Sequence, residues 1–235
     1  MNNVAIAFLI TALAGLSTGI GSCIPFFGKK TNTKFLAVAL GFSAGVMIYV
    51  SMLELLPNAM DSLGASFGAK QGTLWAIIAF FAGIGAIAII DKIIPENENP
   101  HSVTSPEHVA AALGHNHKLM RTGLFTALAI TIHNFPEGAI ISMPLRAEGE
   151  SKGKAFLGGV LSGVVEPIGA VLTLLAAQLV IPALPYLLSF AAGAMLYVVV
   201  EELIPEMSQG THTNVGTIFF AIGFSLMMVL DVALG

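Results

Sequence analysis

The chain has 235 residues, of which 55% are hydrophobic and only 10% are charged, and its mean hydropathy is +0.85. Soluble domains carry about 25% charged residues, so this composition excludes an ordinary soluble protein and indicates an integral membrane protein. The net charge of −4 arises from few, scattered groups and defines no surface field. Because the apolar stretches exceed the roughly 20 residues needed to cross the hydrocarbon core, we predict helices rather than barrel strands.

We therefore predict an all-α membrane protein, one transmembrane domain over 1–235, with about seven helices. The predicted spans are 4–27, 35–60, 73–95, 119–145, 154–181, 184–207 and 214–234. The first loop contains Lys29, Lys30 and Lys34, which places that loop in the cytoplasm and the N-terminus outside.

The longest polar stretch, 96–118, is predicted to be a cytoplasmic loop. It contains four histidines, His101, His108, His115 and His117. Histidines gathered in a loop can bind metal weakly. A loop without any binding role stays an equal alternative.

The chain also repeats itself. At an offset of 148 residues, FSAGVMIYVSMLELLP (42–57) matches FAAGAMLYVVVEELIP (190–205), and Gly15 falls on Gly163. A looser match pairs FFAGIG (80–85) with FFAIGF (219–224). Three helices followed later by three similar helices are typical of a transporter built from structural repeats, whose site lies at the repeat interface.

The predicted span 119–145 carries His133, Asn134 and Glu137 near its middle. An ionisable side chain at that depth costs a contested ~3 to ~15 kcal/mol and persists mainly where it faces protein, water or a cation. Spacings of three and four residues place the three side chains on one helix face. Imidazole, amide and carboxylate groups together suit zinc, iron or manganese. We predict a metal site; the alternative is a His and a Glu that satisfy each other inside a helix bundle.

A second buried carboxylate is expected on the fifth predicted span. Glu166 lies inside this apolar span and is followed by Pro167, whose ring should disturb the helix beside it. Its repeat partner, Thr18, is uncharged. The packing of the repeat therefore does not require a carboxylate, which favours a functional role for Glu166.

Three further carboxylates precede prolines near helix ends. Glu54 and Glu202 are repeat equivalents, and Glu201 lies beside Glu202. These residues either line a cation path or lie at the membrane interface without a role, and the sequence leaves both interpretations open.

The segments TALAITIHNFPEGAIIS and LSGVVEPIGAVL and the paired ELLP and EELIP resemble the ZIP (Zrt/Irt-like protein) metal transporters over essentially the whole chain, the bacterial zinc transporters above all. The resemblance implies a multi-pass protein of the inner (cytoplasmic) membrane, not an enzyme, that takes up divalent cations. These are chiefly Zn2+, with Fe2+, Mn2+, Cd2+ and Co2+ beside it. It implies eight helices and a binuclear site at mid-membrane. Asn134, Glu137 and Glu166 match ligands of the oxygen-rich position, Glu137 would also serve the zinc position, and His133 is the histidine of the motif.

One feature departs from the family pattern, which has the HNxPEG motif twice. Here the motif occurs once. The residues before it resemble those that precede the first copy in the family, and the residues after it resemble those that follow the second copy, as if everything between the two copies were lost. The result would be one hybrid helix, 119–145. With a single span between the triplets, we predict parallel triplets, Ser151 outside and Gly235 in the cytoplasm.

The sequence leaves two other functions as alternatives. A transport-impaired remnant or partner protein is one alternative. An intramembrane metalloenzyme is less favoured, because the chain has no H-E-x-x-H motif. Expected partners are divalent metal ions and the lipid bilayer, with no nucleic acid; a homodimer is left open.

Overall fold

The computed structural model describes residues 3–23, 33–93, 142, 151–208 and 213–234, and its elements there are helical. The α-helices are α1 (Asn3–Gly21), α3 (Thr33–Tyr49), α4 (Leu56–Phe67), α5 (Ala69–Ile93), α8 (Lys152–Leu175), α9 (Ala177–Val198), α10 (Ile204–Met207) and α11 (Thr213–Leu234). Two π-helical segments, η1 (Val50–Leu55) and η2 (Val199–Leu203), join α3 to α4 and α9 to α10. The predicted all-α fold is confirmed. The loop 96–118 and, except for Ser142, the span 119–145 lie outside the described residues.

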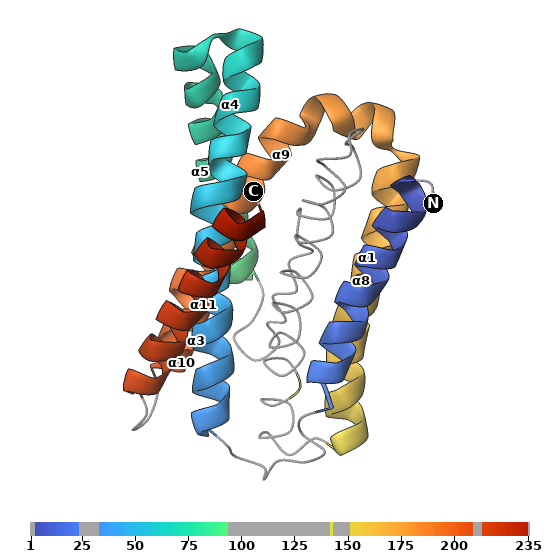
Figure 1. Ribbon diagram of the computed structural model, residues 1–235, viewed down its shortest axis with the longest axis vertical. Helices are drawn as coiled ribbons and strands as arrows, with labels where there is room; N and C mark the ends of the chain where they lie inside the picture. Colours follow the sequence, from blue (N-terminus) through green and yellow to red (C-terminus); the bar gives the residue numbers. More distant parts are fainter. Residues whose placement is uncertain (1–2, 24–32, 94–141, 143–150, 209–212, 235) are drawn as a thin grey trace.

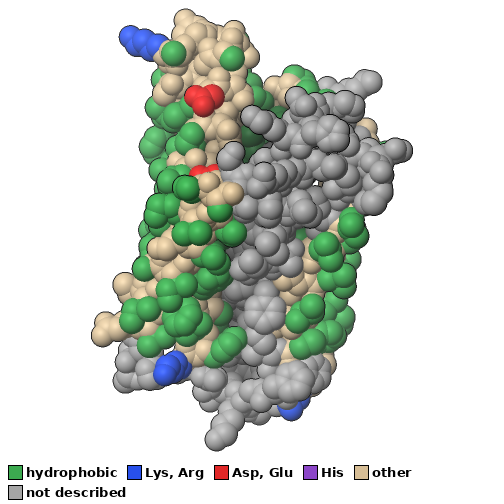
Figure 2. Space-filling view, in the orientation of Figure 1, with side chains coloured by type: hydrophobic (Ala, Val, Ile, Leu, Met, Phe, Trp, Pro, Cys, Tyr) green, Lys and Arg blue, Asp and Glu red, His purple; other side chains and the backbone are tan. Residues whose placement is uncertain are grey.

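Six of the seven predicted spans have a helical counterpart. Five helical segments are long and apolar enough to cross a membrane: Lys34–Phe67, Ala69–Ile93, Lys152–Thr173, Val180–Met207 and Asn214–Ala233. The apolar helix α1 occupies the first predicted span. In Figure 2, hydrophobic side chains cover the flanks, while Lys and Arg side chains lie at the upper and lower ends. This distribution is the one expected of a protein that spans a bilayer.

Each helix of the first triplet packs against a helix of the second: α1 against α8, α3 against α11 and α5 against α9 (Figure 1). Small residues allow the close approach that lipid-embedded helices need. A Cβ on Gly15 would collide with the carbonyl oxygen of Gly163, and a Cβ on Gly163 would collide with that of Gly15. Two residues predicted to be repeat equivalents thus face each other across the α1–α8 contact.

The same contacts correct the register of the third helix of each repeat. Gly45 of α3 packs on the carbonyl of Phe220, and its equivalent, Gly193 of α9, packs on the carbonyl of Phe80. Phe80 therefore corresponds to Phe220, not to Phe219 as the FFAGIG match predicted. The sequence match aligned identical residues, whereas the packing aligns the two phenylalanines whose backbone carbonyls contact the equivalent glycines.

The two triplets are inverted, so the prediction of parallel triplets is wrong. Helix α5 returns antiparallel to α3 and α4 through a turn at Gly68, whose φ is +85°. Helix α9 runs parallel to α5, because Ser189 and Tyr197 of α9 meet Ala76 and Asp91 of α5 in the same order. Helix α9 is thus antiparallel to its own repeat equivalent, α3.

The lysines follow this inverted arrangement. Lys34 begins the span of α3, Lys92 ends α5, and Lys152 and Lys154 begin α8. Helices α3 and α8 begin at the lower end in Figure 1, and α5 runs toward that end from its turn with α4, which lies at the upper end and is followed by Lys70. The positive-inside rule makes the lower end cytoplasmic.

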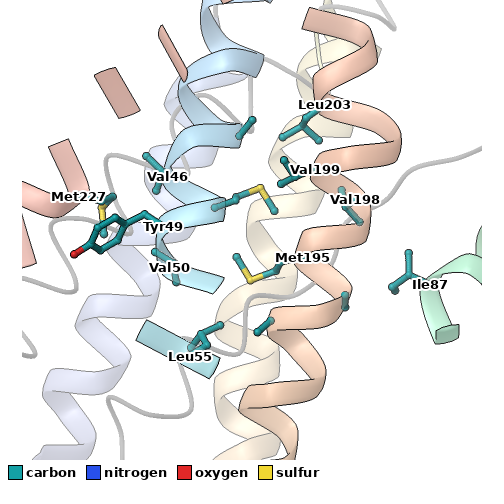
Figure 3. Packing of buried hydrophobic residues seen from close by; sticks show 14 of the residues in the cluster. Val46, Tyr49, Val50, Leu55, Ile87, Met195, Val198, Val199, Leu203 and Met227 are labelled. Atoms are coloured by element: carbon teal, nitrogen blue, oxygen red, sulfur yellow. The ribbon is translucent and has the colours of Figure 1, made fainter. Parts of the chain in front are cut away.

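The core lies between the two central helices of the repeats. Figure 3 shows Met195 and Val199 directed toward α3 and η1, while Tyr49 points away from them, toward Met227 of α11. Burial in lipid supplies little drive for helix association, so this contact is held by close packing of side chains. The packing brings α9 against η1 and thereby sets the two π-helical segments near the centre of the protein.

Candidate metal site

Glu166 lies at the crossing of α1 and α8, where it is only 8% exposed. The Thr18 hydroxyl donates to its Oε1 over 3.3 Å, and the carbonyl of Ala14 is a second acceptor for that hydroxyl at 3.4 Å. Thr18 is fully buried. A carboxylate this deep in a membrane protein is a functional candidate by default, and the structure confirms the buried position predicted for Glu166.

The local sequence explains how the helices approach at this point. Pro167 lies inside α8, and its Cδ would be 3.7 Å from a Cβ on Gly15. Proline cannot donate to the carbonyl four residues earlier, that of Gly163. The α1–α8 contact therefore combines a glycine pair, a proline and one hydrogen-bonded carboxylate at a single level.

The other three predicted ligands, His133, Asn134 and Glu137, lie outside the described residues. Ser142, five residues after Glu137, is helical and fully buried. The site prediction for these three residues accordingly stays a prediction, and Glu166 is the one member of the set that the structure places.

The predicted path carboxylates lie in the two π-helical segments. Glu54 is in η1 and is half-buried, whereas in η2 Glu202 is half-buried and Glu201 is exposed. The Leu56 N–H donates to the Ser51 carbonyl, and the Ile204 N–H donates to the Val199 carbonyl. Both bonds join residues that are five apart, as in a π-helix, and they are repeat equivalents. The same π-helical distortion therefore occurs in both repeats.

Proline explains the distortion, since Pro57 and Pro205 follow at the first turn of α4 and α10 and lack the N–H that an α-helical bond would use. Such π-helical turns often mark functional sites. Within the described part of the chain, however, no three His, Cys, Asp or Glu side chains gather at metal-binding distance. The structure therefore does not join Glu54, Glu201 and Glu202 to Glu166 in one cluster.

Sequence reasoning missed two pairs that link the repeats. Tyr49 donates to Asp231 Oδ2 over 2.7 Å, and its equivalent, Tyr197, donates to Asp91 Oδ2 over 3.5 Å. Asp91 and Asp231 are related by the offset of 140 that also relates Phe80 to Phe220. Aligning the third helices by this offset rather than by identical letters would have shown that Asp91 and Asp231 are equivalent, although not that each contacts a tyrosine.

The sequence profile described as "ZIP Zinc transporter" matches residues 112–231, about half of the chain. The chain belongs to the ZIP family. It is 47% identical to a zinc transporter ZupT of Clostridium perfringens, over 90% of each chain, and 41% identical to one of Chlorobaculum parvum, over 90% of this chain and 91% of that protein. A third ZIP relative, the zinc transporter ZupT of Chlorobium chlorochromatii, is 38% identical over 99% of this chain and 98% of its own length.

The alignments also contain positions that have no residue in the ZIP chain described here. The alignment with the Chlorobium chlorochromatii relative runs over 268 residues, whereas this chain has 235, so at least 33 aligned positions have no residue here. A membrane-crossing helix needs about 17–25 residues. The missing length is thus enough for one membrane-crossing helix.

Proposed function

We propose that this protein takes up zinc across the cytoplasmic membrane, through a mid-membrane site built from His133, Asn134, Glu137 and Glu166. The observation that carries this proposal is the buried Glu166, which lies between α1 and α8 in a chain of the ZIP family. Zinc is the cargo named for the relatives described above. The role of each ligand rests on the sequence motif.

The position of Glu166 suits a cation that crosses the membrane. It is 14 residues from the start of α8, or about 21 Å from the cytoplasmic end at 1.5 Å per residue. This depth lies inside a hydrocarbon core about 30 Å thick. A cation at this level would neutralise a carboxylate that lipid alone would disfavour.

The donor set also bears on which cations fit. Imidazole nitrogen with carboxylate and amide oxygens suits zinc, and the oxygen-rich part of the set suits iron and manganese as well. We propose Zn2+ as the main cargo and Fe2+, Mn2+, Cd2+ and Co2+ as competitors. We further propose that Glu54 lies on the outer part of the path and Glu202 on the cytoplasmic part, because inversion places their helix ends on opposite sides.

The experiment is zinc binding and uptake by the purified chain in proteoliposomes, for the unchanged protein and for Glu166→Gln. The amide keeps the size of the side chain but removes its charge, so we expect zinc stoichiometry and uptake to fall together. Glu206→Gln is the matched control, since Glu206 is a half-buried glutamate outside the proposed site. Unchanged binding in Glu166→Gln would refute the site, whereas binding without uptake would favour the transport-impaired remnant.

A further inference from the structure

Two serine hydroxyls in the spanning helix formed by α3, η1 and α4 are buried without a hydrogen-bond partner among the described residues. Ser43 is 1% exposed and Ser51 is fully buried, and the Oγ of each makes no hydrogen bond. A buried hydroxyl is disfavoured unless it is satisfied by protein or by ordered water. These two groups therefore indicate a ligand that can hydrogen-bond.

Other hydroxyls in the described helices show that an internal partner was available. Ser22, Ser66 and Thr73 each donate to the carbonyl four residues earlier, over 2.7–3.1 Å. Ser43 and Ser51 do not use this bond, although both lie in helices. Among the described residues, neither hydroxyl has another hydrogen-bond partner in place of this carbonyl.

The inverted repeat shows that helix packing alone does not demand these hydroxyls. The equivalent of Ser43 is Ala191, and the equivalent of Ser51 is Val199; both are buried and apolar. Between these positions, both repeats have a methionine: Met47 in the first repeat and Met195 in the second. One repeat thus has two hydroxyls around its buried methionine, and the other repeat has none.

We infer that Ser43 and Ser51 hold ordered water along the inner face of α3 and η1. Buried waters typically satisfy otherwise unpaired polar groups, and a hydroxyl can both donate to water and accept from it. The two residues are eight apart, or about 12 Å along the helix, so each hydroxyl would hold a water of its own. These waters lie between mid-membrane and the outer side, where Glu54 follows Ser51 in η1.

The ordered water adds a step to the proposed zinc uptake, and its role in transport rests on that proposed function. A divalent cation that enters from outside must exchange bulk water for other oxygen atoms, and ordered water with hydroxyl groups supplies them. The equivalent stretch of α9 and η2, which faces the cytoplasmic half, offers Ala191 and Val199 instead. The proposed path is therefore wetter on its outer half than on its inner half.

The test is radiolytic hydroxyl-radical labelling of the full chain in detergent, read residue by residue by mass spectrometry. Radicals form from water close to a side chain and oxidise a methionine thioether to the sulfoxide. We expect Met47 to be oxidised several-fold faster than Met195; because Met47 is also the more exposed of the two, at 8% against 1%, the fall of Met47 labelling in the variants below is the deciding measurement. Equal rates for the two methionines would overturn the inference.

The repeat supplies the variants for this experiment. In the double variant Ser43→Ala, Ser51→Val, which installs the residues of the second repeat, labelling of Met47 should fall to the level of Met195. Ser66→Ala, at an exposed serine of α4 that bonds its own backbone, should leave Met47 labelling unchanged. If the double variant fails to fold, the single variants Ser43→Ala and Ser51→Ala replace it, each expected to lower the labelling. Undiminished labelling in folded variants would refute the inference of ordered water.

The labelling does not depend on transport, so the two proposals can fail separately. Loss of zinc binding in the unchanged chain would refute the proposed function and leave the inference of ordered water intact. In proteoliposomes, we expect Ser51→Val to slow zinc uptake several-fold without changing zinc stoichiometry. Unchanged uptake together with lost Met47 labelling would refute the role of the water in transport.

Discussion

Tyr49 and Asp231 join the two inverted repeats through a 2.7 Å hydrogen bond between α3 and α11. The ring of Tyr49 also packs edge-on against Phe224, with ring centroids 5.3 Å apart. The equivalent hydrogen bond, between Tyr197 and Asp91, is longer, at 3.5 Å. The two copies of this contact in the two repeats thus differ in length.

The first prediction concerns these two contacts. Tyr49→Phe should lower the free energy of unfolding by about 0.5–1.5 kcal/mol, because it removes one interhelical hydrogen bond and keeps the ring. Tyr197→Phe should cost less, since its bond is longer. Reversible unfolding of the purified protein in mixed micelles measures both. A larger loss for Tyr197→Phe than for Tyr49→Phe would contradict this ranking.

The second prediction concerns the glycine contacts between triplets. Gly45→Ala should destabilise the protein by about 1–3 kcal/mol, because its Cβ would overlap the Phe220 carbonyl and force backbone apart. Gly85→Ala is the control: no heavy atom lies within 4 Å of its would-be Cβ, so this helical change should stabilise by about 0.5–1 kcal/mol. Similar thermal shifts for the two variants would count against the α3–α11 packing.

The third prediction tests the inverted arrangement. In a Cys23→Ala background, single cysteines at Ser66, Ser151 and Ala233 are labelled in intact cells with an impermeant maleimide. Ser66 and Ala233 should react from outside and Ser151 only from the cytoplasm, because α4 and α11 end on the outer side and α8 begins on the inner side. Ser151 labelled from outside would restore the parallel arrangement that the sequence had suggested.

The fourth prediction concerns pH. Metal binding requires a neutral imidazole and ionised carboxylates, so zinc affinity should weaken as pH falls from about 7.5 to about 5.5, through the ordinary range of histidine. Isothermal titration with zinc across that interval measures it. His133→Ala should show weaker binding at the higher pH and a shallower fall. An affinity that does not change with pH would exclude His133 from the ligand shell.

Composition and repetition predicted most of the fold. Long apolar stretches placed the helices, and the offset of 148 correctly paired Gly15 with Gly163 and the ELLP segment with EELIP. The direction of the second triplet was missed, because one visible span between triplets implied parallel repeats. Lys92, Lys152 and Lys154 carried the opposite signal, since only an inverted arrangement gathers them on one side.

One residue of the predicted site can be compared with the structure, and its role in metal binding stays a prediction. Glu166 was recognisable as a charge inside an apolar span, and the structure buries it as predicted. Its contact with Thr18 was not foreseen, because a sequence offset relates two residues without saying that they touch. The repeated π-helical turns were likewise hidden, since Pro57 and Pro205 predict a disturbed helix but not the kind of disturbance.

The contact between Thr18 and Glu166 has a consequence for the origin of the chain. In a dimer of two identical halves, a residue on the two-fold axis meets its own copy, so a carboxylate there would face a second carboxylate. Two such groups in a buried place must share a proton or repel each other. A glutamate opposite a threonine therefore requires two halves that differ in sequence, as the two repeats of this chain do. Only after the repeats had diverged could this position keep one carboxylate without a second carboxylate facing it.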